Sequence, residues 1–180
     1  KMNGRKNKAI ILDRDGVINE DNGHVGTIER FQFIDGVFDA LRDLQQEDYL
    51  LIIITNQAGI GKGYYTTQDY QRVTQYMIDK LAEEKISISK IYHCPHRADE
   101  NCTCRKPKPK LLEDAIFEYN INEEQSWIIG DKISDIEMAN RTSLKRLLIE
   151  SPCTHSLKIQ KFKDLREAAA YILCNSSYIL

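Results

Sequence analysis

The chain has 180 residues, of which 42% are hydrophobic and 29% charged, an ordinary globular mixture that suits one domain with its own core. Lys plus Arg number 25 against 27 Asp plus Glu, and this net charge of -2 gives no electrostatic reason to expect nucleic acid or an anionic membrane as a partner. No apolar run approaches the ~20 residues of a membrane span. The basic start, Lys1–Lys8, has no apolar signal-peptide segment behind it, so we expect a cytoplasmic protein.

Short apolar runs alternate with amphipathic stretches, which is typical of buried parallel strands and the helices that cover them. Thr66 or Thr67 can cap the longest helix, because Asp69 stands where a capping box needs an acceptor. In chain order we expect a strand at 8–12, a helix at 36–48, a strand at 50–54, a helix from 66 to about 85, a strand at 91–92, a helix at 109–119, a strand at 126–129, a helix from 134 to about 141, a strand at 146–149 and a closing helix at 162–173.

This alternation predicts right-handed crossovers and an α/β fold, namely a doubly wound (Rossmann-like) parallel sheet with helices on both faces. We expect residues 1–180 to form a single domain. The stretch Gly59–Gly63 lacks the Ser or Thr that follows Lys in a nucleotide-binding P-loop, so we interpret it as a flexible loop and a candidate substrate contact. Ser151–Lys161 is also expected to be a loop, and Asn175–Leu180 to fray.

Three of the apolar runs end on residues suited to phosphate or metal chemistry, namely Asp13, Thr55 and Asp131. Ligands of open parallel sheets bind beyond the carboxyl ends of the strands, so we expect these residues to lie together. The Thr55 hydroxyl and the backbone N–H groups after it can cradle phosphate oxygens, although a plain strand cap is the alternative. Asp131 can complete a hard-cation site with Asp13.

Asp13 and Asp15 are paired carboxylates after the first strand. One can bind a divalent cation and attack phosphorus, while the other holds the proton that a leaving alcohol needs; an Asx-rich turn is the alternative. Lys106 can offset charge on a transferred phosphoryl group, although a basic pair with Arg105 is also typical of a solvated face. Asp135 can orient Lys106, orient a metal-bound water or cap a helix.

Three cysteines, Cys94, Cys102 and Cys104, gather near two histidines, His93 and His96. In a reducing cytosol such a cluster favours a metal site over disulfides.

The ordered set of Asp13 with Asp15, Thr55, Lys106, and Asp131 with Asp135 resembles the four motifs of the haloacid dehalogenase superfamily of phosphatases. Over about Ala9 to Ile149 the chain is more narrowly similar to the D-glycero-D-manno-heptose-1,7-bisphosphate 7-phosphatases, near relatives of the histidinol-phosphate phosphatases. The stretches that carry this similarity are Asp13–Asn19, Thr55–Ile60, Cys94–His96, Cys102–Pro107 and Gly130–Lys132.

The resemblance implies a magnesium-dependent phosphatase of carbohydrate metabolism, including lipopolysaccharide biosynthesis. Asp13 would be the nucleophile and Asp15 the general acid and then base, with Thr55 and Lys106 holding the phosphate. Asp13, Asp131 and the backbone carbonyl of Asp15 would bind Mg²⁺. The small phosphorylated sugar would contact Asp21, Asn22, Gly23, His24, Thr55, Asn56, Gln57, Ala58, Arg105, Lys106 and Lys132.

The resemblance also implies a zinc ion bound by Cys94, His96, Cys102 and Cys104, in a small loop at about 93–105. Cys-x-His followed by Cys-x-Cys can close a tetrahedron, and a closed zinc site is structural. The zinc would pin the loop that carries Arg105 and Lys106. Reduced thiols without metal are the alternative, and His93 is expected to be a bystander.

The segments Gly16–Phe31 and Thr55 to the zinc loop leave no room for a large cap domain, so short loops must provide substrate specificity. A histidinol-phosphate phosphatase, a phosphoryl transferase to another alcohol and a catalytically dead, zinc-stabilised binding module are the rival interpretations. The intact acidic set argues against a dead site, because crowded carboxylates are costly without a cation. Both anomers of the heptose substrate stay open, and a monomer is the expected state.

Overall fold

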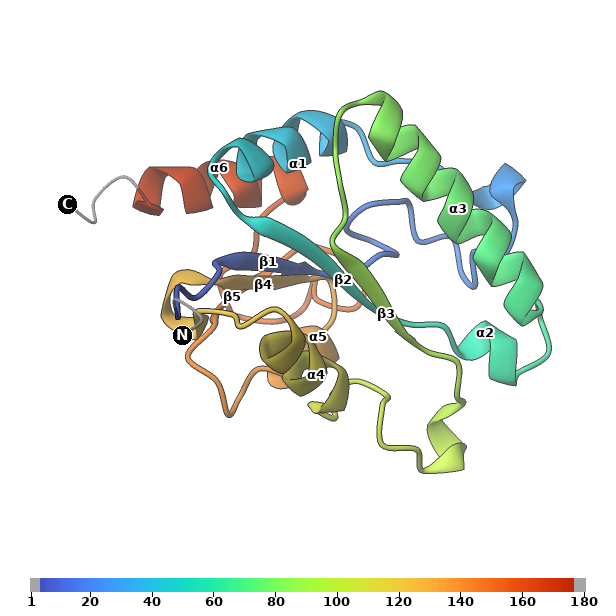
Figure 1. Cartoon of the computed structure of the whole chain (residues 1–180). Helices are drawn as coiled ribbons and strands as arrows, with labels where there is room; N and C mark the ends of the chain where they lie inside the picture. Colours follow the sequence, from blue (N-terminus) through green and yellow to red (C-terminus); the bar gives the residue numbers. More distant parts are fainter. Residues whose placement is uncertain (1–3, 177–180) are drawn as a thin grey trace.

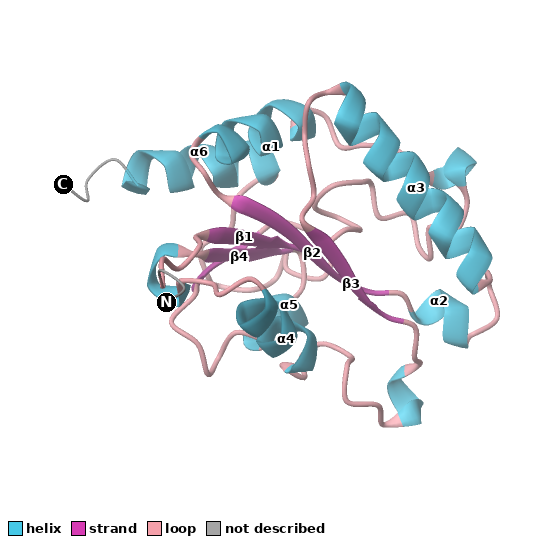
Figure 2. Ribbon diagram, in the orientation of Figure 1, coloured by secondary structure: helices cyan, strands magenta, loops and turns pink. Residues whose placement is uncertain are grey.

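The computed structural model describes residues 4–176. At its centre lies a five-stranded sheet in the order β3-β2-β1-β4-β5, in which every neighbouring pair is parallel (Figures 1 and 2). The strands are β1 (Ala9–Leu12), β2 (Leu50–Asn56), β3 (Lys90–Cys94), β4 (Trp127–Gly130) and β5 (Lys145–Leu148). The predicted doubly wound parallel sheet is therefore confirmed.

Helices cover both faces of the sheet (Figure 1). One face carries α1 (Val37–Gln46), α3 (Thr67–Glu83) and α6 (Leu165–Ser176), and the other carries α4 (Lys110–Glu118) and α5 (Ile133–Glu137). Short 3-10 helices lie at Ile28–Arg30, Ala98–Glu100 and Glu123–Gln125. Among residues 4–176, no helix has the length and apolar character needed to cross a membrane.

Strand β1 shows why the strands are apolar throughout. Ile10 and Leu12 pack into the core beneath α1, α3 and α6, while Ala9 and Ile11 pack into the core on the α4 side. Successive side chains of a strand point to opposite faces, so a strand with helices on both sides must be hydrophobic at every position.

The start of α3 is fixed by the predicted capping box. Thr66 Oγ1 accepts a hydrogen bond from the Asp69 backbone N–H at 3.1 Å, and Asp69 Oδ2 accepts one from the Thr66 N–H at 2.8 Å. A side-chain N-cap contributes about 1 kcal/mol to stability.

The prediction of a loop at Gly59–Gly63 was wrong in part, because Ala58–Gly61 forms the short helix α2. Tertiary contacts outweigh the poor helix propensity of glycine here. The Gly61 N–H donates to the Pro95 carbonyl at 2.9 Å, and a Cβ on Gly59 would lie 2.1 Å from the Tyr65 ring.

Most other boundaries differ from the prediction by one or two residues, and those of the last two helices differ by more. Helix α5 ends at Glu137 instead of about Arg141, and α6 begins at Leu165. Asn175 and Ser176, where fraying was expected, are helical, and the rest of that prediction, residues 177–180, lies outside the described residues. Ser151–Lys161 contains no helix or strand, as expected of a loop.

Candidate active site

The sheet places the predicted site residues at one edge. Strand β1 lies between β2 and β4, so the carboxyl ends of these three strands are neighbours. Asp13 follows β1, Thr55 is the next-to-last residue of β2, and Asp131 follows β4. Each of the three is less than a tenth exposed. The expected meeting of these residues at one edge is therefore observed.

Lys106 lies at the centre of this edge although it comes from the loop before α4. Its Nζ is 3.0 Å from Asp13 Oδ1 and 2.7 Å from Asp135 Oδ1, and it donates to the Ile54 carbonyl at 2.7 Å. The Lys106 backbone N–H donates to Asn56 Oδ1 at 3.1 Å, which ties the loop to the end of β2. Burial disfavours the charged amine, but Asp13 and Asp135 outweigh this and raise the pKa of Lys106, so the side chain stays cationic.

Asp135 carries out two of the three roles that its position allowed. Its Oδ1 pairs with Lys106 Nζ, while its Oδ2 accepts the backbone N–H groups of Asp131 at 3.1 Å and Lys132 at 3.0 Å, at the start of α5. Both carboxylate oxygens are thus already bound.

Asp13 and Asp131 differ in the direction of their pKa shifts. Burial opposes ionisation of Asp13, but the charges of Lys106 and Lys132 prevail and lower its pKa. Burial, followed by the negative charge of Asp13, raises the pKa of Asp131 to about 8. When neighbouring carboxylates lack sufficient positive charge, the pKa of one of them rises, because two adjacent negative charges repel each other.

A ligand atom of each of Asp13, Asp131 and Asp135 lies within 4.8 Å of the others. Because Asp135 is engaged with Lys106 and the start of α5, Asp13 and Asp131 are the carboxylates left for a cation. Gly16 makes their approach possible, since a Cβ there would lie 2.0 Å from Asp131 Oδ2, and its φ of +87° favours glycine. The carboxylates and the raised pKa of Asp131 fit a hard divalent cation such as Mg²⁺.

Asp15 is held by three side-chain donors. Arg14 Nε and Asn19 Nδ2 each donate to Asp15 Oδ1 at 2.9 Å, and Gln57 Nε2 donates to Oδ2 at 3.2 Å. Arg14 is 1% exposed and also donates to the Val25 carbonyl at 2.9 Å. The sequence pattern did not predict Arg14 or Asn19 as site residues; their only signal was their position within the acidic motif.

A cavity of about 520 Å³ opens above these groups. Predicted site residues that line it are Asp13, Asp15, Asp21, Gly23, His24, Asn56, Gln57, Ala58, Arg105, Lys106 and Lys132. Two predicted contacts do not line it: Thr55 is 1% exposed, and Asn22 instead accepts from Arg30 Nη2 at its carbonyl and at Oδ1. Lys62 and Tyr65 also line the cavity. Lys62 lies in the stretch Gly59–Gly63, which was a candidate substrate contact, whereas Tyr65 was missed because it follows that stretch.

Two predicted cations stand at the cavity wall. Lys132 Nζ lies 3.2 Å from Asp21 Oδ2 and 3.3 Å from Asp131 Oδ1, and Arg105 Nη1 donates to the His96 carbonyl at 3.4 Å. Lys132 therefore connects the loop after β1 with the end of β4. A larger cavity of about 660 Å³ lies around Lys8 and Trp127, at the amino ends of the strands, and contains none of the predicted site residues.

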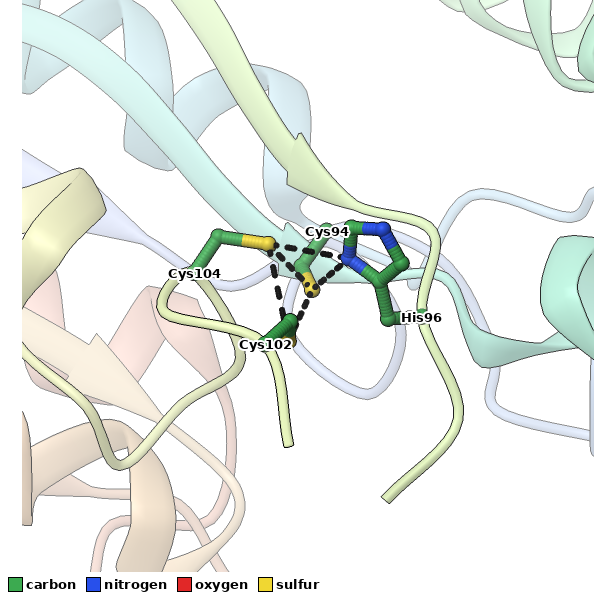
Figure 3. Close-up of side chains that lie close together, drawn as sticks. All are labelled: Cys94, His96, Cys102 and Cys104. Carbon is green, nitrogen blue, oxygen red and sulfur yellow. Dashed lines mark hydrogen bonds between the residues drawn. The ribbon is translucent and has the colours of Figure 1, made fainter. Parts of the chain in front are cut away.

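The four predicted zinc ligands converge, as Figure 3 shows. His96 Nδ1 lies 3.5 Å from Cys94 Sγ and 3.3 Å from Cys104 Sγ, and Cys102 Sγ lies 3.6 Å from Cys94 Sγ and 3.8 Å from Cys104 Sγ. These separations are near the edges of about 3.5–3.8 Å that follow from tetrahedral zinc bond lengths, and the Cys94–Cys104 separation of 2.6 Å is shorter. His93 stacks on Tyr70 at 4.3 Å instead of joining the cluster.

The cysteine–histidine cluster is joined to both walls of the cavity. Cys104 directly precedes Arg105 and Lys106 in the chain. On the other side, the Gln57 backbone N–H donates to the Cys94 carbonyl at 2.7 Å, and the Gly61 N–H donates to the Pro95 carbonyl. A metal ion in the cluster would therefore fix the loop with Lys106 and the segment with α2 together.

The chain is similar to known proteins in sequence and in fold. The HAD-hydrolase-like family model matches residues 103–174. D-glycero-beta-D-manno-heptose-1,7-bisphosphate 7-phosphatase of Helicobacter pylori (strain ATCC 700392 / 26695) is 43% identical over 89% of this chain and 95% of that protein. D-glycero-alpha-D-manno-heptose-1,7-bisphosphate 7-phosphatase of Campylobacter jejuni is 42% identical over 90% of this chain and 94% of that protein.

Among solved structures, D,D-heptose 1,7-bisphosphate phosphatase of B. bronchiseptica, complexed with magnesium and phosphate, superposes with a TM-score of 0.83 at 27% identity. The match covers 93% of this chain and 99% of that one. The chain therefore belongs to the D-glycero-D-manno-heptose-1,7-bisphosphate 7-phosphatase family of haloacid dehalogenase-like hydrolases.

Proposed function

We propose that the protein removes the 7-phosphate of D-glycero-D-manno-heptose 1,7-bisphosphate. The observation that carries this proposal is the ionised Asp13 carboxylate, held beside Lys106 at 3.0 Å in the cavity of about 520 Å³. A carboxylate nucleophile next to a buried cation is the arrangement that a phosphoryl group needs. The heptose bisphosphate comes from the names of relatives that match this chain over nearly its whole length.

Asp13 attacks phosphorus in line with the leaving sugar oxygen and forms an aspartyl phosphate. Lys106 Nζ binds the oxygens of the transferred group, where negative charge must be offset in the transition state. The Thr55 hydroxyl does not line the cavity and is buried against Gln57 of the cavity wall; the proposal assigns it as a second ligand of these oxygens, reached as the phosphate enters. The lowered pKa of Asp13 keeps the nucleophile ionised at neutral pH.

Asp15 lines the cavity beside Asp13 and serves as the general acid and then the general base. It gives its proton to the oxygen of the departing heptose and then accepts a proton from the water that splits the aspartyl phosphate. Arg14, Asn19 and Gln57 keep its carboxylate in place through both steps.

Asp13 and Asp131, with the backbone carbonyl of Asp15, would hold Mg²⁺. When bound, the ion supplies positive charge for the phosphate oxygens. The pKa of Asp131, about 8, is that of the protein without Mg²⁺. Asp131 would lose its proton on binding the ion, because a metal ligand must be deprotonated.

Cys94, His96, Cys102 and Cys104 would hold a structural Zn²⁺, which fixes Lys106 and Arg105 relative to α2. Thiolate ligands must stay reduced to bind zinc, which favours a reducing compartment such as the cytoplasm.

The cavity wall suits a substrate with two phosphates. Lys62, Arg105 and Lys132 line it in addition to Lys106. Since Lys106 serves the reacting phosphate, the other cations are available for the phosphate at C1. Relatives of similar identity are named for the beta and the alpha anomer, so both anomers are candidate substrates.

The test is steady-state phosphate release from both anomers of the bisphosphate, with histidinol phosphate as the rival substrate and Asp13→Asn as the blank. The proposal predicts rapid, magnesium-dependent release from one or both anomers and none from the blank. Faster release from histidinol phosphate would contradict the heptose assignment and leave the phosphatase assignment intact.

A further inference from the structure

The buried side-chain amide of Gln57 connects two residues of the proposed mechanism: Asp15, the general acid, and Thr55, a ligand of the phosphate. Gln57 is 1% exposed, and its Nε2 donates to Thr55 Oγ1 at 2.9 Å and to Asp15 Oδ2 at 3.2 Å. Its Oε1 accepts from the Tyr65 hydroxyl at 2.5 Å and from Arg14 Nη2 at 3.4 Å. Both amide hydrogens and both acceptor positions of this side chain are therefore used.

The surroundings of Gln57 permit only this orientation of the amide. Arg14 can only donate, so the atom that faces it must be the carbonyl oxygen. A flipped amide would turn its N–H groups toward Arg14 and its oxygen toward the Asp15 carboxylate, which sets donor against donor and acceptor against acceptor. The assignment thus follows from chemistry as well as from the placement of the atoms.

Tyr65 is fixed in its role as a donor. Its ring is 7% exposed and fits between two glycines, because a Cβ on Gly26 or Gly59 would lie 2.3 Å or 2.1 Å from ring atoms. Burial raises the pKa of Tyr65 to about 12, so the phenol keeps its proton throughout the neutral range.

The hydrogen bonds of Gln57 determine which hydrogen Thr55 can donate and which oxygen of Asp15 can be protonated. The Thr55 hydroxyl accepts from Gln57, which leaves its own hydrogen free to donate to a phosphoryl oxygen. Asp15 Oδ1 already accepts from Arg14 and Asn19, whereas Oδ2 accepts only from Gln57 among the described residues. Oδ2 is accordingly the oxygen with room for the transferred proton.

We propose that the Gln57 side chain is a positioning residue of the phosphatase reaction, which aligns the acid Asp15 with the phosphate ligand Thr55, and that Tyr65 fixes its amide. The inference rests on the proposed function. Gln57 acts through Asp15 and Thr55 and does not itself react.

Two variants test the inference. Gln57→Met keeps the size of the side chain and removes all four hydrogen bonds, and Tyr65→Phe removes one. Tyr64→Phe is the matched control, because Tyr64 is the neighbouring tyrosine and is 66% exposed. Thermal melting and zinc content check that each variant is folded.

The readout is kcat/KM for a sugar phosphate and for para-nitrophenyl phosphate. A general acid contributes about 10²-fold or more when the leaving group is an alcohol, and much less when it is a stable phenolate. Gln57→Met should therefore lower kcat/KM about 100-fold for the sugar phosphate. For the aryl phosphate the loss should be about tenfold or less. Tyr65→Phe should cost about fivefold, as one neutral hydrogen bond does, and Tyr64→Phe should leave kcat/KM unchanged.

The comparison of leaving groups decides the inference. Equal losses of kcat/KM with the sugar phosphate and the aryl phosphate would overturn it, while turnover by the wild type would still uphold the phosphatase. A wild type inert toward every phosphomonoester would instead refute the proposed function, and the inference with it.

Discussion

The Lys106 ammonium lies 2.7 Å from the Asp135 carboxylate, and both side chains are 3% exposed. The same ammonium reaches Asp13, so one cation from the loop before α4 is shared by residues that follow β1 and β4. The charge of the phosphate site is therefore assembled from three separate segments of the chain.

Lys106→Met should lower kcat by about 10²–10³-fold, because a preorganised donor to the transferred phosphoryl group is lost. It should also lower the free energy of unfolding by about 3–5 kcal/mol, since Asp13 and Asp135 are left as buried carboxylates without their cation. Adding Asp135→Asn should recover part of the stability and none of the activity. Steady-state kinetics and denaturant unfolding of both variants measure this; a double variant no more stable than Lys106→Met would contradict the pairing.

Gly16→Ala should raise the magnesium concentration required for half-maximal rate, because the new Cβ would lie 2.0 Å from Asp131 Oδ2 and must displace that carboxylate. Gly63→Ala is the matched control: its φ of +73° imposes a similar backbone strain, but nothing lies within 4 Å of the new Cβ. Both variants should lose about 1–2 kcal/mol of stability from the left-handed backbone. Only Gly16→Ala should change the magnesium concentration required for half-maximal rate, and equal magnesium curves for the two would refute the role of Gly16.

Magnesium should stabilise the protein more as the pH rises toward 8. Without metal, Asp131 holds its proton up to a pKa of about 8 in the folded state, against a pKa of 3.8 for an ordinary aspartate. The folded state then binds more protons than the unfolded state, so this group makes the metal-free protein less stable as the pH increases through that window.

Magnesium must displace that proton, so its apparent affinity should increase by up to about tenfold per pH unit below 8. The increase in Tm on adding Mg²⁺, measured at about pH 6 and about pH 8, checks this. Asp131→Asn should show no such increase at either pH. A larger magnesium effect at the lower pH would contradict the assignment of Asp131.

Loss of the zinc site should reduce activity without touching a reacting group. Cys102→Ser should lower zinc content and Tm, and it should lower kcat/KM because the loop with Arg105 and Lys106 loses its anchor. Cys153→Ser is the control, since Cys153 is exposed and lies outside the cluster. Full activity of a Cys102→Ser protein shown to be zinc-free would contradict the structural role.

Lys62→Met should distinguish substrates by their second phosphate. Lys62 lines the cavity, and loss of one charge-assisted contact corresponds to about tenfold in affinity. KM for heptose 1,7-bisphosphate should rise about tenfold, and KM for heptose 7-phosphate should not change. Parallel increases for both substrates would place Lys62 at the reacting phosphate instead.

Much of this site followed from the sequence because strand ends carry it. The apolar runs that became β1, β2 and β4 are unambiguous, and parallel strands must bring their carboxyl ends to one edge. The spacing of Cys94, His96, Cys102 and Cys104 likewise indicated a cluster, which the fold closes. The assignment of residues 1–180 to one domain, the roles of the site residues and the monomeric state stay predictions.

Other features depend on tertiary contacts that no local pattern encodes. Helix α2 contains Gly59 and Gly61, which suggest a loop by propensity, and it forms because Tyr65 and the Pro95 carbonyl pack against these glycines. Arg14 is charged, yet it is buried: its Nε donates to the adjacent Asp15, and its Nη2 donates to Val25 and Gln57, which lie 11 and 43 residues further along the chain. Such residues become visible only when the chain is folded.

The most direct measurement follows both phosphates of D-glycero-D-manno-heptose 1,7-bisphosphate by ³¹P NMR during turnover with magnesium. The proposed function predicts that the C7 signal disappears, the C1 signal persists and inorganic phosphate appears, with no change when Asp13→Asn replaces the wild type. Loss of the C1 signal first, or equal turnover by Asp13→Asn, would contradict it.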